Sequence, residues 1–219
     1  MNINRSSLSP NFDDIELNVE FIVIHYTACS LQSTLDIFAN KERKVSSHIV
    51  VAEDGAVYEV VKCWDKTVNR AWHAGKSIFN DGKKEWRDFN DFSIGIEIVN
   101  LNGNVFEYTD EQYEAVINCI SHFKERFKSL QNPERIIGHE QIAKSRGKVD
   151  PGWKFNWEKI YQACYPGMTY PKREANLLPA LRESTDKLLS NIPESKEKEI
   201  QFWQTLNTTM EAASKLSQT

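Results

Sequence analysis

The stretch that decides the fold reads RIIGHEQIAKSRGKVDPG over residues 135–152. It begins with an apolar segment of strand length, residues 135–138, which leads directly into His139. A polar segment follows, and Lys148 and Asp150 then stand two residues apart in front of a Pro-Gly turn. This order brings a possible metal ligand, a cation and a carboxylate to one end of a strand.

A second apolar run, Asn18 to Thr27, also leads into a histidine. Its centre reads FIVIHYT over residues 21–27, and this β-branched composition predicts a buried strand that carries His25 near its end. Taken alone, His25 is more readily explained as a core histidine with satisfied hydrogen bonds. Because open α/β sheets place their sites at the carboxyl ends of strands, we expect His25 and His139 to lie close together.

A third strand is predicted over residues 93–99, SIGIEIV. Alternation places its three isoleucines on one face and Gly95, Glu97 and Val99 on the other. Glu97 is therefore a carboxylate within an apolar run, where ionisation is costly unless the charge is paired. Two interpretations stay open: a structural pairing with Arg or Lys, and a raised pKa that serves proton transfer.

The remaining elements follow from local patterns. We expect a helix over Ser33–Glu42 with Ser33 as its cap, a hairpin over residues 46–61 that turns at Glu-Asp-Gly, a helix over Asp110–Phe127 capped by Thr109 or Asp110, and a helix over residues 156–164. Residues 76–92 are interpreted as a surface loop. Strands that alternate with helices predict an α/β fold with a central mixed β-sheet flanked by helices.

The chain divides into three parts: a loose lead-in over residues 1–16, a catalytic domain over 17–167 and a helical C-terminal extension over 168–219. Two apolar stripes in the extension have helical spacing. They comprise Leu177, Leu181, Leu188 and Ile192, and Ile200, Trp203, Leu206, Met210 and Ala213. The main domain, a second copy or a protein partner such as an adaptor or an inhibitor could cover these stripes, and packing onto the chain's own domain is the simplest expectation.

Composition narrows the class of protein. The 219 residues are 40% hydrophobic with a formal net charge of −4, so nucleic acid is not an expected partner. The four cysteines are scattered without a CxxC motif, which indicates reduced thiols. We see no signal peptide and no apolar window long enough to span a membrane. We therefore expect a cytoplasmic protein, or one exported by a signal-independent route to act in the periplasm.

Two histidines and one carboxylate, His25, His139 and Asp150, have the ligand count of a catalytic zinc site with one open position. Zinc at this site would lower the pKa of water to about 7 and polarise a carbonyl oxygen. Glu97 would then take a proton from water and pass it to a leaving amine, and Lys148 would stabilise the developing oxyanion. The implied reaction is hydrolysis of an amide.

Six motifs carry a family resemblance. They are IHYTA at 24–28, SSH at 46–48 with EDG at 53–55, AWHAG at 71–75, NDFSIGIE at 90–97, GH at 138–139 and KVDPG at 148–152. In these motifs the chain resembles the zinc-dependent N-acetylmuramoyl-L-alanine amidases of the type-2 family, whose fold is shared with peptidoglycan recognition proteins. The resemblance implies zinc at His25, His139 and Asp150, and catalytic roles for Glu97 and Lys148.

The resemblance also implies substrate contacts. It assigns Trp72 and His73 to the substrate groove, although the residues alone weigh loop packing and substrate contact evenly for Trp72. Arg146 is expected to meet an anionic group of the substrate. Ser47 stands where the phage-lysozyme branch has a tyrosine, so the chain is more similar to the branch of anhydro-muropeptide amidases. For His48, a half-buried strand residue is at least as good an explanation as a contact with substrate.

The implied reaction is cleavage of the amide between the lactyl group of N-acetylmuramic acid and L-alanine, in peptidoglycan or a muropeptide. The alternative is a non-catalytic peptidoglycan-binding module of the same fold. Three biological roles are compatible with the sequence: cell-wall recycling, a phage lysin and a delivered antibacterial effector.

Overall fold

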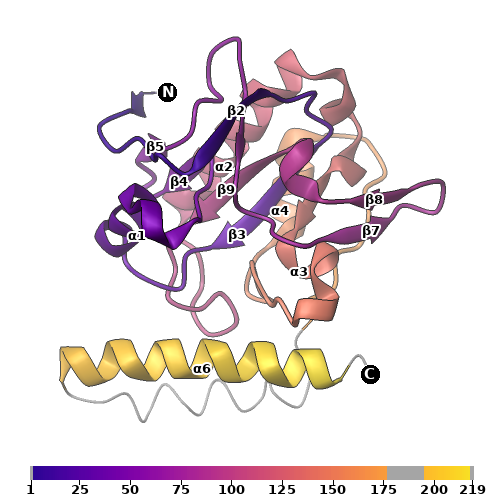
Figure 1. The fold of residues 1–219 in the computed structure, drawn as a ribbon. Coiled ribbons are helices and arrows are strands. Elements are labelled where there is room, and N and C mark those ends of the chain that lie inside the picture. The colour runs from indigo at the N-terminus through magenta and orange to yellow at the C-terminus, as the bar shows by residue number, and fades with distance from the viewer. Residues whose placement is uncertain (1, 177–194, 218–219) are drawn as a thin grey trace.

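A six-stranded mixed sheet forms the centre of the computed structural model, which describes residues 2–176 and 195–217 (Figure 1). In spatial order the strands are β1 (Ile3–Asn4), β5 (Val57–Glu59), β4 (Ile49–Val51), β9 (Ser93–Ile98), β3 (Phe21–Tyr26) and β10 (Ile136–Gly138). The β4–β5 pair is antiparallel, and the other neighbours are parallel. The predicted mixed α/β sheet is confirmed.

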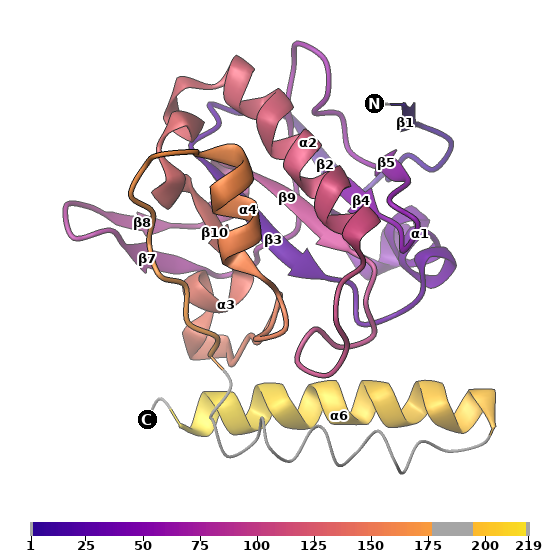
Figure 2. The same ribbon diagram turned by 180° about the vertical axis from the view of Figure 1, so that it is seen from behind.

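Helices α2 (Asp110–Arg126) and α4 (Trp157–Cys164) lie side by side on one face of the sheet (Figure 2). The predicted capping box is present at the start of α2, where Thr109 accepts from the backbone N–H of Gln112 and Gln112 accepts from that of Thr109. Val116, Ile120 and Phe123 are fully buried on this helix. The apolar stripe therefore holds α2 against the sheet, as its period predicts.

The opposite face of the sheet is covered by a second hairpin and by α3 (His139–Ile142). The hairpin consists of β7 (Ile78–Asn80) and β8 (Glu85–Arg87), and it projects to the right in Figure 1. The prediction of a surface loop over residues 76–92 is therefore wrong. The short strands have no apolar alternation, but Trp86 turns inward and packs against Phe21.

Two further expectations are corrected. The first 16 residues are not a loose lead-in, because β1 extends the main sheet and β2 (Phe12–Glu16) pairs with β6 (Asn69–Ala71). Backbone hydrogen bonds hold these polar strands in place, so their side-chain pattern does not predict that they are strands. Helix α1 (Leu31–Ala39) begins after Ser30, whose hydroxyl accepts from the Ser33 N–H; Ser33 is not the cap. Short 3₁₀ turns complete the domain: η1 (Lys41–Arg43), η2 (Phe89–Asp91), η3 (Lys128–Gln131), η4 (Pro133–Arg135) and η5 (Lys144–Arg146).

Strands β3 and β9 position the site. They are parallel neighbours at the centre of the sheet, and all six residues of β3 are buried. Their register places His25 level with Glu97 and Val23 level with Gly95, so these four residues share one face of the sheet. His25 and Glu97 therefore lie together near the carboxyl ends of the two strands.

The C-terminal helix α6 (Lys196–Leu216) lies across the side of the domain where β3 ends (Figures 1 and 2). Trp203 and Met210 of the second predicted stripe are buried against Val105 and Val149 of the main domain, whereas Ile200 is exposed. This stripe is thus covered by the chain's own domain. The stripe from Leu177 to Ile192 lies outside the described residues.

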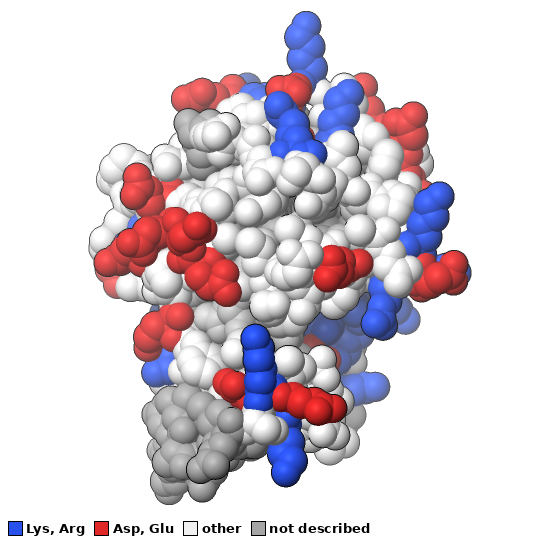
Figure 3. All heavy atoms as spheres, turned by 90° about the vertical axis from the view of Figure 1, so that its left-hand side faces the viewer, with Lys and Arg blue, Asp and Glu red and all other residues white. Residues whose placement is uncertain are grey.

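Across residues 2–176 and 195–217, no helix combines the length and the apolar character needed to cross a bilayer. The described part of the chain has four free cysteines, of which Cys63, Cys119 and Cys164 are buried. Figure 3, which shows the molecule from the left of Figure 1, shows acidic side chains gathered on one flank and a largely uncharged centre.

Candidate metal centre

His25, His139 and Asp150 converge at the carboxyl end of the sheet. Strands β3 and β10 are parallel and pair Ile24 with Gly138. The residues that follow, His25 in β3 and His139 at the start of α3, therefore lie beside each other. The Nδ1 atoms of both histidines lie 3.0 Å from Oδ2 of Asp150. One ligand atom from each residue falls within 4.8 Å of the others, and all three residues are buried. The predicted convergence is confirmed.

The hydrogen bonds of the outer ring nitrogens assign the tautomers. Nε2 of His139 lies 3.2 Å from the carbonyl oxygen of Ala74, which can only accept, so Nε2 carries the hydrogen. Nε2 of His73 lies 3.4 Å from the carbonyl oxygen of Ser93, so by the same reasoning this nitrogen carries the hydrogen. Nδ1 of His73 is then the acceptor for Nε2 of His25, which lies 3.1 Å away. Both Nδ1 atoms of His25 and His139 therefore direct a lone pair toward Asp150.

His25 and Asp150 both have perturbed pKa values. Burial and the neighbouring His139 lower the pKa of His25 to about 4, so its imidazole is neutral at pH 7. Burial alone would raise the pKa of Asp150, but the charge of His139 and hydrogen bonds from His139 and His25, when these imidazoles are protonated, hold it well below its usual value. With the tautomers assigned above, two imidazole lone pairs and a carboxylate face one another at 3.0 Å, an arrangement that repels unless a cation lies between them. The three residues could hold a metal ion, with the donor set of a catalytic site.

Glu97 lies beside this donor set. Its Oε2 atom is buried and has no hydrogen-bond partner within the described chain. Burial and the charge of Asp150 raise the pKa of Glu97 to about 8, and Lys148 opposes this shift. Among residues 2–176 and 195–217, Glu97 forms no ion pair, so the geometry favours the proton-transfer interpretation over the structural one.

One cavity of about 260 Å³ joins these groups. His25, His139 and Asp150 line it, together with Glu97 and Lys148. The Nζ atom of Lys148 donates to Oε1 of Glu211 at 2.5 Å, and Glu211 belongs to α6. The cavity is also lined by Asn207 of the same helix. Sequence reasoning missed both α6 residues, because an apolar stripe does not indicate which surface its helix meets.

Of the three residues predicted to contact substrate, two line the cavity and one does not. His73 and Arg146 line the cavity, and the Arg146 guanidinium donates to the carbonyl oxygen of Ala74 at 2.7 Å. Gly95 makes room for His73, because a Cβ there would lie 2.5 Å from the imidazole Cγ. Trp72 does not line the cavity; its indole N–H donates to Asp13 at 2.8 Å. The role of Trp72 in substrate binding stays a prediction.

Two other histidines have structural contacts. Nδ1 of the fully buried His48 accepts from the Gly95 N–H at 3.0 Å, and its Nε2 donates to the carbonyl oxygen of Asn69 at 2.8 Å. These bonds favour the interpretation of His48 as a core residue. Nε2 of His122 donates to the carbonyl oxygen of Trp64 at 2.9 Å, and the two rings stack with centroids 3.9 Å apart.

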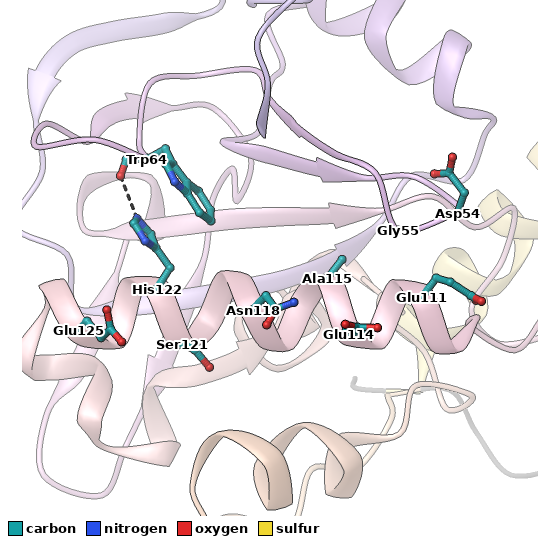
Figure 4. A pocket seen from close by; sticks show the side chains of 10 residues that line it. All are labelled: Asp54, Gly55, Trp64, Glu111, Glu114, Ala115, Asn118, Ser121, His122 and Glu125. Carbon is teal, nitrogen blue, oxygen red and sulfur yellow. Dashed lines mark hydrogen bonds between the residues drawn. The ribbon is translucent and has the colours of Figure 1, made fainter. Parts of the chain in front are cut away.

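The His122–Trp64 pair lies in a second hollow, of about 640 Å³, on the outer side of α2 (Figure 4). Acidic side chains along α2 face this hollow, namely Glu111, Glu114 and Glu125. None of the three candidate metal ligands lines it. The chemistry of the chain is therefore concentrated at the smaller cavity.

Known proteins were compared with the chain and its structure. The family model for N-acetylmuramoyl-L-alanine amidase matches residues 16–153. A selenomethionine derivative of AmpD is 28% identical with a TM-score of 0.59, and the match covers 73% of this chain and 93% of that chain. The amidase AmiD from E. coli, solved with anhydro-N-acetylmuramic acid-L-Ala-D-gamma-Glu-L-Lys, is 27% identical with a TM-score of 0.56, covering 73% and 60%.

AmpDh3 from Pseudomonas aeruginosa shares the fold at 24% identity and a TM-score of 0.57, and the match covers 93% of this chain and 79% of that chain. A comparison with curated protein sequences gives no match.

Proposed function

The chain belongs to the N-acetylmuramoyl-L-alanine amidase family, whose model matches more than half of it, and from this premise we propose which bond it cleaves and how. The bond is the amide between the lactyl group of N-acetylmuramic acid and L-alanine of the stem peptide. The observation that carries the proposal is the convergence of His25, His139 and Asp150 beside Glu97 on one cavity. The muropeptide bound by AmiD supports a peptidoglycan fragment as the substrate class.

The proposed cofactor is zinc, held by Nδ1 of His25, Nδ1 of His139 and the Asp150 carboxylate. Two imidazoles and a carboxylate match the three-ligand sets of catalytic zinc enzymes. When bound, zinc supplies a Lewis acid that polarises the scissile carbonyl and lowers the pKa of water. His73 and the Ala74 carbonyl orient the two imidazoles through their outer nitrogens.

Protons move through Glu97 in this proposal. A metal ion held by the three ligands would favour the ionised form of the neighbouring Glu97. The Glu97 carboxylate then accepts a proton from the attacking water and returns it to the nitrogen of L-alanine as the amide bond breaks. The orphaned Oε2 atom supports this role, because it has an unused acceptor position on the cavity side of β9. The return of the proton produces a neutral amine as the leaving group.

Lys148 stabilises the charge that develops on the carbonyl oxygen. Its ammonium group borders the same cavity and is three-quarters shielded from solvent, so its attraction for an oxyanion is stronger than at an open surface. Arg146 is placed to meet an anionic group of the stem peptide, and His73 to contact the substrate.

Turnover of a purified muramoyl-tripeptide, followed by chromatography of the released peptide, tests the proposal. We expect Glu97→Gln to keep its zinc and lose turnover, and His139→Ala to lose both. Full cleavage by His139→Ala without bound zinc would refute the mechanism. A wild-type protein that binds the muropeptide without cleaving it would instead establish the non-catalytic binding module.

A further inference from the structure

Helix α6 packs closely against the main domain. Trp203 and Met210 are 2% and 3% exposed, and Ser214 is fully buried. The Trp203 ring packs edge-on against Phe106, with centroids 4.7 Å apart. Burial of side chains this large stabilises the docked position of the helix.

The backbone of α6 also approaches the loop that carries Lys148 and Asp150. Gly147 lies directly beneath the helix, and a Cβ at this position would lie 2.0 Å from the carbonyl oxygen of Glu211. Gly147 also has φ of +75°, a conformation that glycine adopts without strain. The backbone of the loop that carries the site therefore approaches the backbone of the helix closely at Gly147.

The same face of α6 brings polar groups to the cavity. Asn207 and Glu211 are one helical turn apart, and both line the cavity that holds the candidate metal ligands. Oδ1 of Asn207 accepts from the hydroxyl of Tyr26 at 2.5 Å, and the Glu211 carboxylate accepts from Lys148 at 2.5 Å. No hydrogen bond between described residues uses Nδ2 of Asn207, which leaves an amide donor for a substrate carbonyl or carboxylate.

The position of α6 limits what can reach the cavity. A helix of 21 residues is about 30 Å long, and α6 extends along one whole side of the domain (Figures 1 and 2). The cavity below it measures about 260 Å³, close to the lower end of the range for small-molecule sites. A continuous glycan strand must run past the scissile bond in both directions, whereas a short fragment needs only one entrance.

We propose that α6 selects the substrate: it admits short, soluble muropeptides, excludes cross-linked wall polymer, and contacts the admitted substrate through Asn207 and Glu211. This inference rests on the function proposed above. Glu211 shares the Lys148 ammonium with the incoming carbonyl oxygen, and Asn207 donates to an acceptor of the stem peptide.

The test compares two substrates with full-length variants that differ in α6 docking. Trp203→Asp places a charge in the interface, and Ile200→Asp places the same charge at a site on α6 that is 51% exposed. For each variant we would measure kcat/KM on a soluble muramoyl-tripeptide and the release of peptide from purified sacculi. We expect Trp203→Asp to raise the ratio of sacculus to soluble cleavage by roughly tenfold, and Ile200→Asp to keep the wild-type ratio.

A second variant keeps the interface and removes the polar contacts. Asn207→Ala/Glu211→Ala should raise KM for the soluble substrate by about fivefold, with unchanged zinc content. An unchanged or lower KM would overturn the proposal that Asn207 and Glu211 contact the substrate. An unchanged ratio in Trp203→Asp, or an equal gain on both substrates, overturns selection by α6. If the wild type cleaves neither substrate, the proposed function fails and this inference falls with it.

Discussion

Replacement of Glu97 by glutamine should stabilise the metal-free protein, and the gain should grow with pH. The folded state raises the pKa of Glu97 to about 8, from an ordinary value of 4.5. Between these two values the folded chain holds a proton that the unfolded chain releases, so the free energy of unfolding falls as pH rises. Glutamine carries no such proton and removes this dependence.

The magnitude follows from the size of the shift. Each pKa unit corresponds to about 1.4 kcal/mol, so the full shift would give a gain of about 3 kcal/mol between roughly pH 5.5 and 8.5. Only part of the Glu97 side chain is buried, although its Oε2 atom is fully enclosed. Allowing for solvent around the exposed part, we expect about 2 kcal/mol.

Urea unfolding of wild type and Glu97→Gln in the presence of a chelator, at several pH values between about 5.5 and 8.5, measures this difference. Comparing the two proteins cancels the contributions of His25 and His73, whose pKa values are lowered by burial. A difference in stability that does not change with pH would refute the assignment of Glu97 as a carboxyl group held neutral by its surroundings.

Three further changes have defined outcomes. Lys148→Met should lower kcat for the muramoyl-tripeptide by roughly 10²–10³ with little change in KM, because it removes a donor used mainly in the transition state; a change in KM alone would contradict that role. Trp203→Ala should cost about 3 kcal/mol in urea unfolding, since the ring is buried against Phe106; a loss below about 1 kcal/mol would mean that α6 contributes little to stability. Thr109→Ala should cost about 1 kcal/mol by removing the cap of α2, whereas Thr208→Ala, at an exposed position of α6, should be nearly neutral; equal losses would contradict the capping argument.

The parts of the fold that could be predicted are those with a strong period or a local motif. β3 and β9 were predictable because β-branched runs have few other stable arrangements, and α2 because its stripe and its Thr109 cap agree. His25 and His139 followed from the rule that strand ends gather at one edge of a sheet. Glu97 was recognisable because a carboxylate inside an apolar strand requires a partner or a function.

Other features depend on contacts that no local pattern encodes. β1 and β2 are held by backbone pairing, so their polar side chains give no alternation to detect. The stripe through Trp203 predicted a buried face on α6, with the chain's own domain as the simplest cover, but not which surface of that domain it meets. Asn207 and Glu211 are ordinary polar residues on a helix until that surface is known, which is why their place at the cavity could not be predicted.

Metal stoichiometry tests the central claim most directly. Zinc titration followed by dialysis should give one tightly bound ion per chain for the wild type. Asp150→Asn preserves the size of the side chain but removes the charge between the two imidazoles, so it should lose that ion while Ile200→Asp retains it. One zinc ion bound as tightly by Asp150→Asn as by the wild type would contradict a metal centre formed by His25, His139 and Asp150.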